Sequence, residues 1–264
     1  MGRLCHSRVA DKSAHWDFHN QEFHCCPTCA TAMRMHFDTI VFDLDGTLVD
    51  TAGDLAASLN HALWTLGRPP VPPSSVRSMV GHGARKLLEL GLAATGGMTA
   101  ALVEAGVAPF MDYYSANIAI HSRPFPGVEA ALDRLAARGH VLAICTNKPE
   151  RLAANLVAEL GWTHRFKALL GADSRPYRKP DPRHLLDTVS EAGGTCSLFV
   201  GDSRTDTDTA AAAGVPLVLV SFGYSTEPVA GLGADVVIDH FDDLDRAMQH
   251  IQGGFSAVCP AGMA

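Results

Sequence analysis

An α/β fold, with a Rossmann-like doubly wound parallel sheet and an inserted all-helical cap, is predicted by two features of the sequence. From Phe37 onward, short apolar runs alternate with segments of helical periodicity, which is typical of a parallel sheet covered by helices on both faces. About 100 residues separate the first two apolar runs, far more than a single crossover needs. We therefore expect a core domain whose chain is interrupted early by a helical unit.

Five apolar runs are expected to form the strands of the core. Each is short and is followed by polar or small residues. They are residues 39–42, 141–145, 198–200, 217–220 and 236–238. Because α/β sheets bind ligands beyond the carboxyl ends of their strands, we expect the functional residues to collect there.

The same pattern predicts the domain boundaries. The α/β core is expected at residues 36–51 and 123–252, and the helical cap at residues 52–122. Residues 1–35 are expected to be a disordered extension and residues 253–264 a tail, since neither stretch shows a helical or strand period.

Helical periodicity is clear inside the insertion. Leu55, Leu59 and Leu63 recur every four residues and form one apolar face. The prolines of residues 69–73 break this helix, and residues 76–80 resume a helical pattern. The insertion is therefore predicted to be helical throughout.

Start and stop signals mark the helices of the core. Pro149 suits the start of a helix because the first turn needs no N–H from it, and Gly161 ends the apolar pattern that follows. A helix from Asp206 to Ala213 is likewise predicted to stop at Gly214.

The N-terminal residues 1–34 concentrate cysteine and histidine, which raises the question of zinc. Cys26 and Cys29 have the C-x-x-C spacing of a zinc site, but such a site needs four ligands and no second tight pair is present. A disordered tail, a zinc-mediated interaction module and a natural start at Met33 or Met35 all stay open. Deleting this segment is expected to leave activity intact.

Composition excludes several classes of protein. A hydrophobic content of 47% over 264 residues can build a full core, and a net charge of -7 argues against binding nucleic acid by neutralising phosphates. There is no run of 18 apolar residues and no secretory signal, so neither a membrane span nor export is expected. We expect a cytoplasmic protein without disulfides that acts on a small molecule, as a monomer or homodimer.

Asp43 and Asp45 follow the first predicted strand directly, with Gly46 after them. Burying carboxylates is costly unless they are paired or bind a metal. Two acids at the end of a buried strand therefore indicate a hard cation held beside a nucleophile.

Other strand ends carry complementary groups. Thr146 and Asn147 follow the second strand, Asp202 and Asp206 follow the third, and Lys179 lies on a loop between them. With Asp43 and Asp45, this ordered set resembles the four motifs of the haloacid dehalogenase (HAD) superfamily of phosphotransferases, from about Phe37 to Ile251. Within it, the stretches at residues 80–85, 146–150 and 220–224 resemble the phosphoglycolate phosphatase family.

The resemblance implies a role for each residue of the first motif. Asp43 would be the nucleophile that forms an aspartyl-phosphate, and Asp45 would act as general acid and then general base. An acid at position 45 argues against a dehalogenase, because a halide leaves without a proton. Gly46 would help to cradle the phosphate through its backbone N–H.

The remaining motif residues are implied to bind phosphate and metal. Thr146 would donate its hydroxyl to the phosphoryl group, Lys179 would place a positive charge on it, and Asn147 would complete the cradle. Mg²⁺ would be held by Asp43, the Asp45 backbone carbonyl and Asp202, with Asp206 holding the metal's waters. The simpler interpretation of Asp206 is a helix N-terminal acid, and Lys148 is interpreted as a solvated turn charge.

Recognition of the leaving group is expected from the cap. The loop at residues 81–85 offers His82 and Arg85, either of which would suit a substrate carboxylate. Replacing Arg85 by Ala is expected to raise KM for phosphoglycolate more than for p-nitrophenyl phosphate. The alternative is an exposed arginine at the start of a helix.

The predicted function is Mg²⁺-dependent hydrolysis of a small phosphomonoester, with 2-phosphoglycolate as the leading substrate and a role in carbohydrate metabolism. A sugar-phosphate phosphatase, a pyrophosphatase and a β-phosphoglucomutase share the same motifs. A phosphonate hydrolase would need Lys86, the one lysine of the predicted cap, to form a Schiff base. A catalytically silent phosphate-binding protein is the alternative from outside the enzymes.

Overall fold

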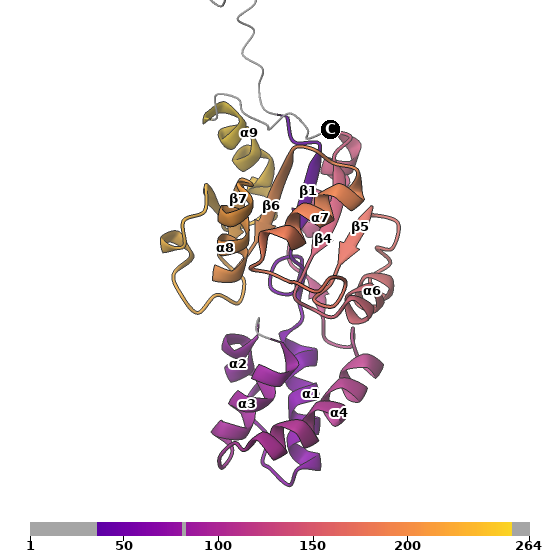
Figure 1. The fold of residues 1–264 in the computed structure, drawn as a ribbon, viewed down its shortest axis with the longest axis vertical. Coiled ribbons are helices and arrows are strands. Elements are labelled where there is room, and N and C mark those ends of the chain that lie inside the picture. Colours follow the sequence, from indigo (N-terminus) through magenta and orange to yellow (C-terminus); the bar gives the residue numbers. More distant parts are fainter. Residues whose placement is uncertain (1–35, 81–82, 255–264) are drawn as a thin grey trace, which may run out of the picture. The chain divides into compact units, whose positions relative to one another are not determined.

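The computed structural model describes residues 36–80 and 83–254, drawn in colour in Figure 1. The N-terminal extension, the cysteines considered for zinc, His82 and residues 255–264 lie outside the described residues. The predictions made for them are therefore not addressed by the structure.

Six parallel strands form the central sheet, in the order β5-β4-β1-β6-β7-β8 (Figure 1). Their bounds are β1 Thr39–Phe42, β4 Val141–Cys145, β5 Ala168–Leu170, β6 Ser197–Gly201, β7 Leu217–Val220 and β8 Val236–Ile238. The predicted fold class is confirmed, as are the five predicted strands. β5 was not predicted, because its residues, Ala-Leu-Leu, are as common in helices as in strands, whereas the predicted three-residue runs contain β-branched or aromatic residues.

Alternate residues of the strands pack on opposite faces of the sheet, as the period of a β-strand requires. Ile40 and Phe42 belong to the larger apolar cluster, and Val41 belongs to the smaller one on the other face. Helices α5 (Val128–Ala137), α6 (Glu150–Glu159) and α9 (Leu244–Gly254) cover the first face, and α7 (Pro182–Ala192) and α8 (Arg204–Ala213) cover the second. Short 3₁₀ turns lie at η2 (Val229–Gly231) and η3 (Phe241–Asp243).

The helix signals in the sequence correspond to observed ends. Pro149 precedes the first residue of α6. Helix α8 begins at Arg204, two residues before the predicted Asp206, because Ser203 caps it, and it ends at Gly214 in the left-handed conformation.

Among the described residues, the insertion contains only helices, which Figure 1 shows grouped apart from the sheet. They are α1 (Ala52–Thr65), α2 (Pro73–Val76), η1 (Arg77–Met79), α3 (Ala84–Ala94) and α4 (Ala100–Ala116). The helical pattern predicted to resume at residues 76–80 is present at residues 76–79, but as the last residue of α2 followed by the 3₁₀ helix η1. Pro73 is the first residue of α2 and does not belong to the preceding break, because the first turn of a helix does not use the N–H that proline lacks. The chain is extended again at Val80. The exact domain boundaries stay predictions.

Two short strands connect the insertion to the core. β2 (Val49–Asp50) and β3 (Arg123–Pro124) pair in an antiparallel ribbon. Beside it, the buried carboxylate of Asp54 accepts hydrogen bonds from the backbone N–H groups of His121 and Ser122, both at 2.8 Å. The two chain crossings into the cap are thus tied to each other.

No helix of the described ranges 36–80 and 83–254 is long and apolar enough to cross a membrane.

Candidate active site

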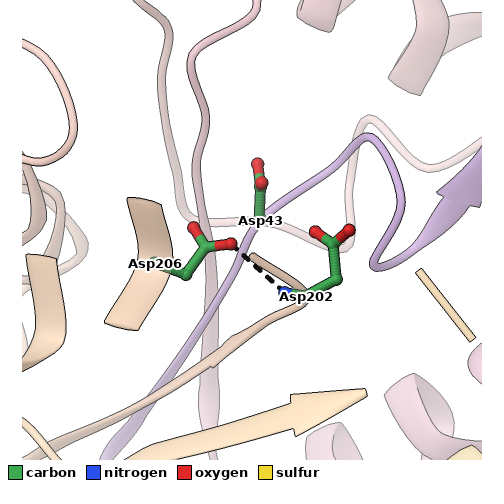
Figure 2. Close-up of side chains that lie close together, drawn as sticks. All are labelled: Asp43, Asp202 and Asp206. Atoms are coloured by element: carbon green, nitrogen blue, oxygen red, sulfur yellow. Dashed lines mark hydrogen bonds between the residues drawn. The ribbon is translucent and has the colours of Figure 1, made fainter. Parts of the chain in front are cut away.

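Three carboxylates gather at the carboxyl ends of β1 and β6. Ligand atoms of Asp43, Asp202 and Asp206 all lie within 4.8 Å of one another. Figure 2 shows the three side chains close together, with the hydrogen bond from the Asp202 N–H to the Asp206 carboxylate dashed (3.2 Å). Buried charges of one sign at this distance require a compensating cation.

One such cation is the ammonium group of Lys179. It lies 3.0 Å from Asp43 Oδ2 and 2.7 Å from Asp206 Oδ1, and its side chain is fully buried. Burial alone would lower the pKa of Lys179, but Asp206 and Asp43 outweigh this effect and raise it. Lys179 is therefore a permanent positive charge inside the cluster.

The carboxylate of Asp43 is held at both oxygens. Oδ1 accepts the N–H of Leu44 at 2.7 Å and Oδ2 faces Lys179. Burial raises the pKa of Asp43 to about 6; the charge of Asp206 adds to this rise, and Lys179 opposes it. A nucleophile at this position is thus fixed in direction, and its ionised form depends on nearby positive charge.

Asp202 is positioned by groups from two other loops. Its Oδ1 accepts from Thr47 Oγ1 at 3.1 Å and its Oδ2 accepts from the Tyr224 N–H at 2.6 Å. Burial raises the pKa of Asp202 well above its ordinary value, with Asp206 and Asp43 adding to the rise. Its surroundings therefore favour a proton or a cation at this carboxylate.

Gly46 leaves space for the Asp202 side chain because it has no Cβ. Gly46 has φ +87°, and a Cβ there would lie 2.5 Å from Asp202 Oδ2. The backbone N–H of Gly46 donates to the Val49 carbonyl at 3.0 Å. The expectation that this N–H binds phosphate is therefore not supported, because the turn after β1 already uses it.

Asp206 is a helix N-terminal acid, as the simpler interpretation expects, and it also lies in the carboxylate cluster. Its Oδ2 accepts from the N–H of Asp202 and from the N–H and hydroxyl of Ser203, which completes a capping box for α8. Its Oδ1 accepts from Lys179. Four donors of the protein thus contact the two oxygens of Asp206, against two for Asp202, so Asp206 is suited to positioning its neighbours more than to direct ligation.

The β4 end contributes Thr146 and Asn147. Thr146 Oγ1 is buried and accepts the Lys148 N–H at 3.2 Å, while Asn147 Nδ2 donates to the Lys179 carbonyl at 3.0 Å. The buried Asn147 Oδ1 has no hydrogen-bond partner within the described part of the chain. Both side chains line the same cavity as Asp43 and Asp45.

That cavity has a volume of about 470 Å³ and is lined by core and insertion residues together. Arg85 lines it, but its side chain is 58% exposed and pairs with Glu104 of α4. A smaller hollow of about 190 Å³ shares Asp43 and Asp45 and includes Lys179 and Asp202. The volume of the larger cavity suits a small-molecule substrate.

Comparison with known proteins identifies the family. A family model for the haloacid dehalogenase-like hydrolases matches residues 37–214. The chain belongs to this family. It is 47% identical over 208 residues to a phosphoglycolate phosphatase of Mesorhizobium japonicum, covering 78% of this chain and 92% of that relative. It is 49% identical over 212 residues to a phosphoglycolate phosphatase of Caulobacter vibrioides, covering 79% and 90%.

Solved structures agree with this assignment of the HAD-like hydrolase. A crystal structure described as a predicted phosphoglycolate phosphatase from Haemophilus somnus 129pt superposes with a TM-score of 0.75 at 33% identity, covering 81% of this chain and 98% of that one. The predicted family and the predicted enzyme class, a phosphoric monoester hydrolase, are confirmed by these matches.

One residue of this HAD-like hydrolase was misjudged from its sequence. Lys148, interpreted as a solvated turn charge, is buried, and its ammonium lies 3.0 Å from Asp45 Oδ1 and 3.1 Å from Oδ2. It also donates to the hydroxyl of Tyr114, on α4 of the insertion. Its place directly after the Thr-Asn pair was the available signal, but the partner that buries it lies 34 residues away in the chain.

Proposed function

We propose that this HAD-like hydrolase is a Mg²⁺-dependent phosphatase that converts 2-phosphoglycolate to glycolate and phosphate through an aspartyl-phosphate on Asp43. The observation that carries the proposal is a partly buried carboxylate at the end of β1, which pairs with Lys179 and lines a cavity with Asp45. The names of the relatives support the substrate.

The residues present fit a divalent cation. Three carboxylates lie within 4.8 Å of one another, of which only Asp206 is saturated by protein donors. Oxygen-only ligands and a low number of carboxylates are what Mg²⁺ prefers. Asp43, Asp202 and the Asp45 backbone carbonyl would hold it. When bound, Mg²⁺ supplies charge neutralisation for the nucleophile and the phosphoryl oxygens.

In the first step, an oxygen of Asp43 attacks phosphorus and the bond from phosphorus to the ester oxygen breaks. Asp45 gives its proton to that oxygen, so the leaving group departs as an alcohol. Leu44 and Lys179 keep the attacking carboxylate in one orientation. This fixed approach is the positioning on which phosphoryl transfer depends.

In the second step, water attacks the phosphorus of the aspartyl-phosphate. Asp45, now ionised, takes the proton of that water, and the bond between phosphorus and the Asp43 oxygen breaks. Inorganic phosphate leaves, and both carboxyl groups return to their starting states.

The remaining groups bind the phosphoryl oxygens. Thr146 would donate its hydroxyl, Lys179 would supply positive charge and Asn147 would turn its side chain to the phosphate. On the cap, Arg85 and His82 stay proposed contacts to the leaving group.

The chemistry is tested by replacing Asp43 with Asn. Phosphate release is expected to fall by roughly 10³-fold or more, and rapid quenching of the wild-type enzyme should trap phosphate on Asp43. Asp208→Asn is the matched control, because Asp208 is exposed on α8, the helix that begins at the site. Undiminished turnover in Asp43→Asn would refute the mechanism.

The substrate is tested with a panel of phosphomonoesters in Mg²⁺ and in EDTA. Phosphate release from 2-phosphoglycolate without any sugar acceptor separates the proposed phosphatase from a mutase. Activity that is unchanged in EDTA would contradict the metal requirement.

A further inference from the structure

The ion pair between Lys148 and Asp45 conflicts with the role of general acid and base that is proposed for Asp45. The ammonium of Lys148 holds both carboxylate oxygens of Asp45, at 3.0 and 3.1 Å, and its third donor is directed at the Tyr114 hydroxyl. To protonate a leaving oxygen, Asp45 must direct an oxygen at the substrate instead. An ammonium with 3% side-chain exposure would then lose its counter-charge.

Lys148 is well suited to take a replacement anion. Its ammonium is buried between Asp45 and the Tyr114 hydroxyl, and a buried cation requires an anionic partner. Burial raises the pKa of Tyr114 to about 12, so its hydroxyl keeps its proton. Both groups line the 470 Å³ cavity. Together they offer an anion a charged donor and a neutral one.

Other cations around the cavity are less suited to this task. Lys179 is committed to Asp43 and Asp206. Arg85 and Lys86 are 58% and 50% exposed and pair with glutamates of the insertion. Arg178 is exposed. Lys148 is therefore the least exposed of the four described cations that line the 470 Å³ cavity, and Lys179 lies in the smaller hollow.

The distance between Lys148 and Asp45 limits which anions Lys148 could bind in the substrate. Because Lys148 lies 3.0 Å from the carboxylate that must reach the leaving oxygen, the anion it binds must be close to that oxygen in the substrate. A carboxylate one carbon from the ester oxygen meets this requirement, and a distal phosphate on a sugar does not. Leu55, Phe110 and Leu152 give the same cavity apolar walls.

We propose that Lys148, with Tyr114, binds the carboxylate of the leaving group and that this contact frees the oxygens of Asp45 from Lys148, so that they can face the substrate. The inference rests on the proposed function and specifies its substrate class as esters of phosphate with 2-hydroxy acids. With a substrate that lacks the carboxylate, Lys148 stays paired with Asp45. Such a substrate should therefore have a lower kcat as well as a weaker affinity.

The experiment compares 2-phosphoglycolate with 2-hydroxyethyl phosphate, which has nearly the same shape but no charge on the leaving group. For the wild-type enzyme, kcat/KM is expected to be roughly 10- to 100-fold higher for 2-phosphoglycolate. Lys148→Met should reduce this ratio to within about 3-fold, mainly by slowing 2-phosphoglycolate. Lys167→Met, an exposed lysine on the core, is the control and should keep the wild-type ratio.

Tyr114→Phe keeps the ammonium and removes only the hydroxyl. It should lower the ratio by about 3- to 10-fold, and it decides the matter if Lys148→Met is inactive on both esters. A wild-type ratio retained in both variants overturns the role of Lys148 and leaves the phosphatase proposal standing. A wild-type enzyme that hydrolyses other monoesters but not 2-phosphoglycolate overturns the proposed substrate and this inference with it.

Discussion

At the scale of single residues, the site depends on small side chains as much as on charged ones. Gly46 and Gly223 both approach Asp202 so closely that a Cβ at either position would collide with its side chain. The carboxylate of Asp202 is thus confined between two turns. Its position is set by the backbone of these turns together with the donors Thr47 and Tyr224.

Gly46→Ala is expected to displace Asp202 and to reduce kcat by at least about 10-fold, because the new Cβ meets Asp202 Oδ2 at 2.5 Å. Steady-state kinetics measures this loss. Gly67→Ala is the matched control: Gly67 also has a positive φ, +69°, but a Cβ there meets nothing within 4 Å. Both variants should lose about 1–2 kcal/mol of stability from backbone strain, and only Gly46→Ala should lose activity. Equal kcat values for the two variants would contradict the steric argument.

At the scale of elements, the loop after β7 connects the site to the crossing into the insertion. The Tyr224 hydroxyl accepts the N–H groups of Thr51 and Ala52, at 2.6 and 3.0 Å, and donates to Asp50 at 2.7 Å. The backbone N–H of the same Tyr224 donates to Asp202. Arg77 of η1 joins this group through a 2.9 Å ion pair with Asp50.

Tyr224→Phe should therefore destabilise the protein by about 1–3 kcal/mol, because the buried Thr51 N–H loses its acceptor and the Ala52 N–H keeps only a 3.3 Å contact with Asp50. Chemical denaturation measures the change. Tyr177→Phe removes a single hydroxyl, bonded to Asp187 on a more exposed surface, and should cost about 0.5 kcal/mol or less. If the two variants are equally stable, the Tyr224 hydroxyl does not hold the crossing.

At the scale of the whole molecule, the buried carboxylates link stability to pH and metal. The pKa of Asp43 is raised to about 6 and that of Asp202 is also raised, chiefly by burial. An acid whose folded-state pKa is raised stabilises the fold below its unfolded pKa, near 4, and this contribution is lost as pH rises through the folded pKa. A bound divalent cation offsets that loss.

Mg²⁺ is thus expected to raise Tm more at pH 7.5 than at pH 5. At 100 times its Kd the ion stabilises by about 2.7 kcal/mol, or roughly 5–10 °C for a chain of this size. The pKa values of His140 and His184 are lowered, so their contributions to stability change with pH in the opposite direction over the same range. These contributions cancel when Tm values with and without Mg²⁺ are compared at one pH. Asp202→Asn should abolish the Mg²⁺ effect. A pH-independent shift in Tm would contradict the linkage.

Much of the site could be predicted because its parts are local. Asp43, Thr146 and Asp202 each follow a strand whose apolar run is visible in the sequence, and parallel strands bring their carboxyl ends to one edge. Lys148 could not be predicted in the same way. Its burial depends on Asp45, 103 residues away, and on Tyr114, and no local pattern encodes such contacts.

By itself, the sequence of this protein determined five of the six strands of the sheet, several helix ends and the order of the chemical groups, because each depends on neighbours a few residues apart. Only the tertiary structure decided how those groups are used: that the Gly46 N–H is taken by its own turn, that Asp206 is saturated by donors, and that Lys148 holds Asp45. Burial and long-range pairing set these outcomes, since the energy of a charge depends on what surrounds it once the chain has folded.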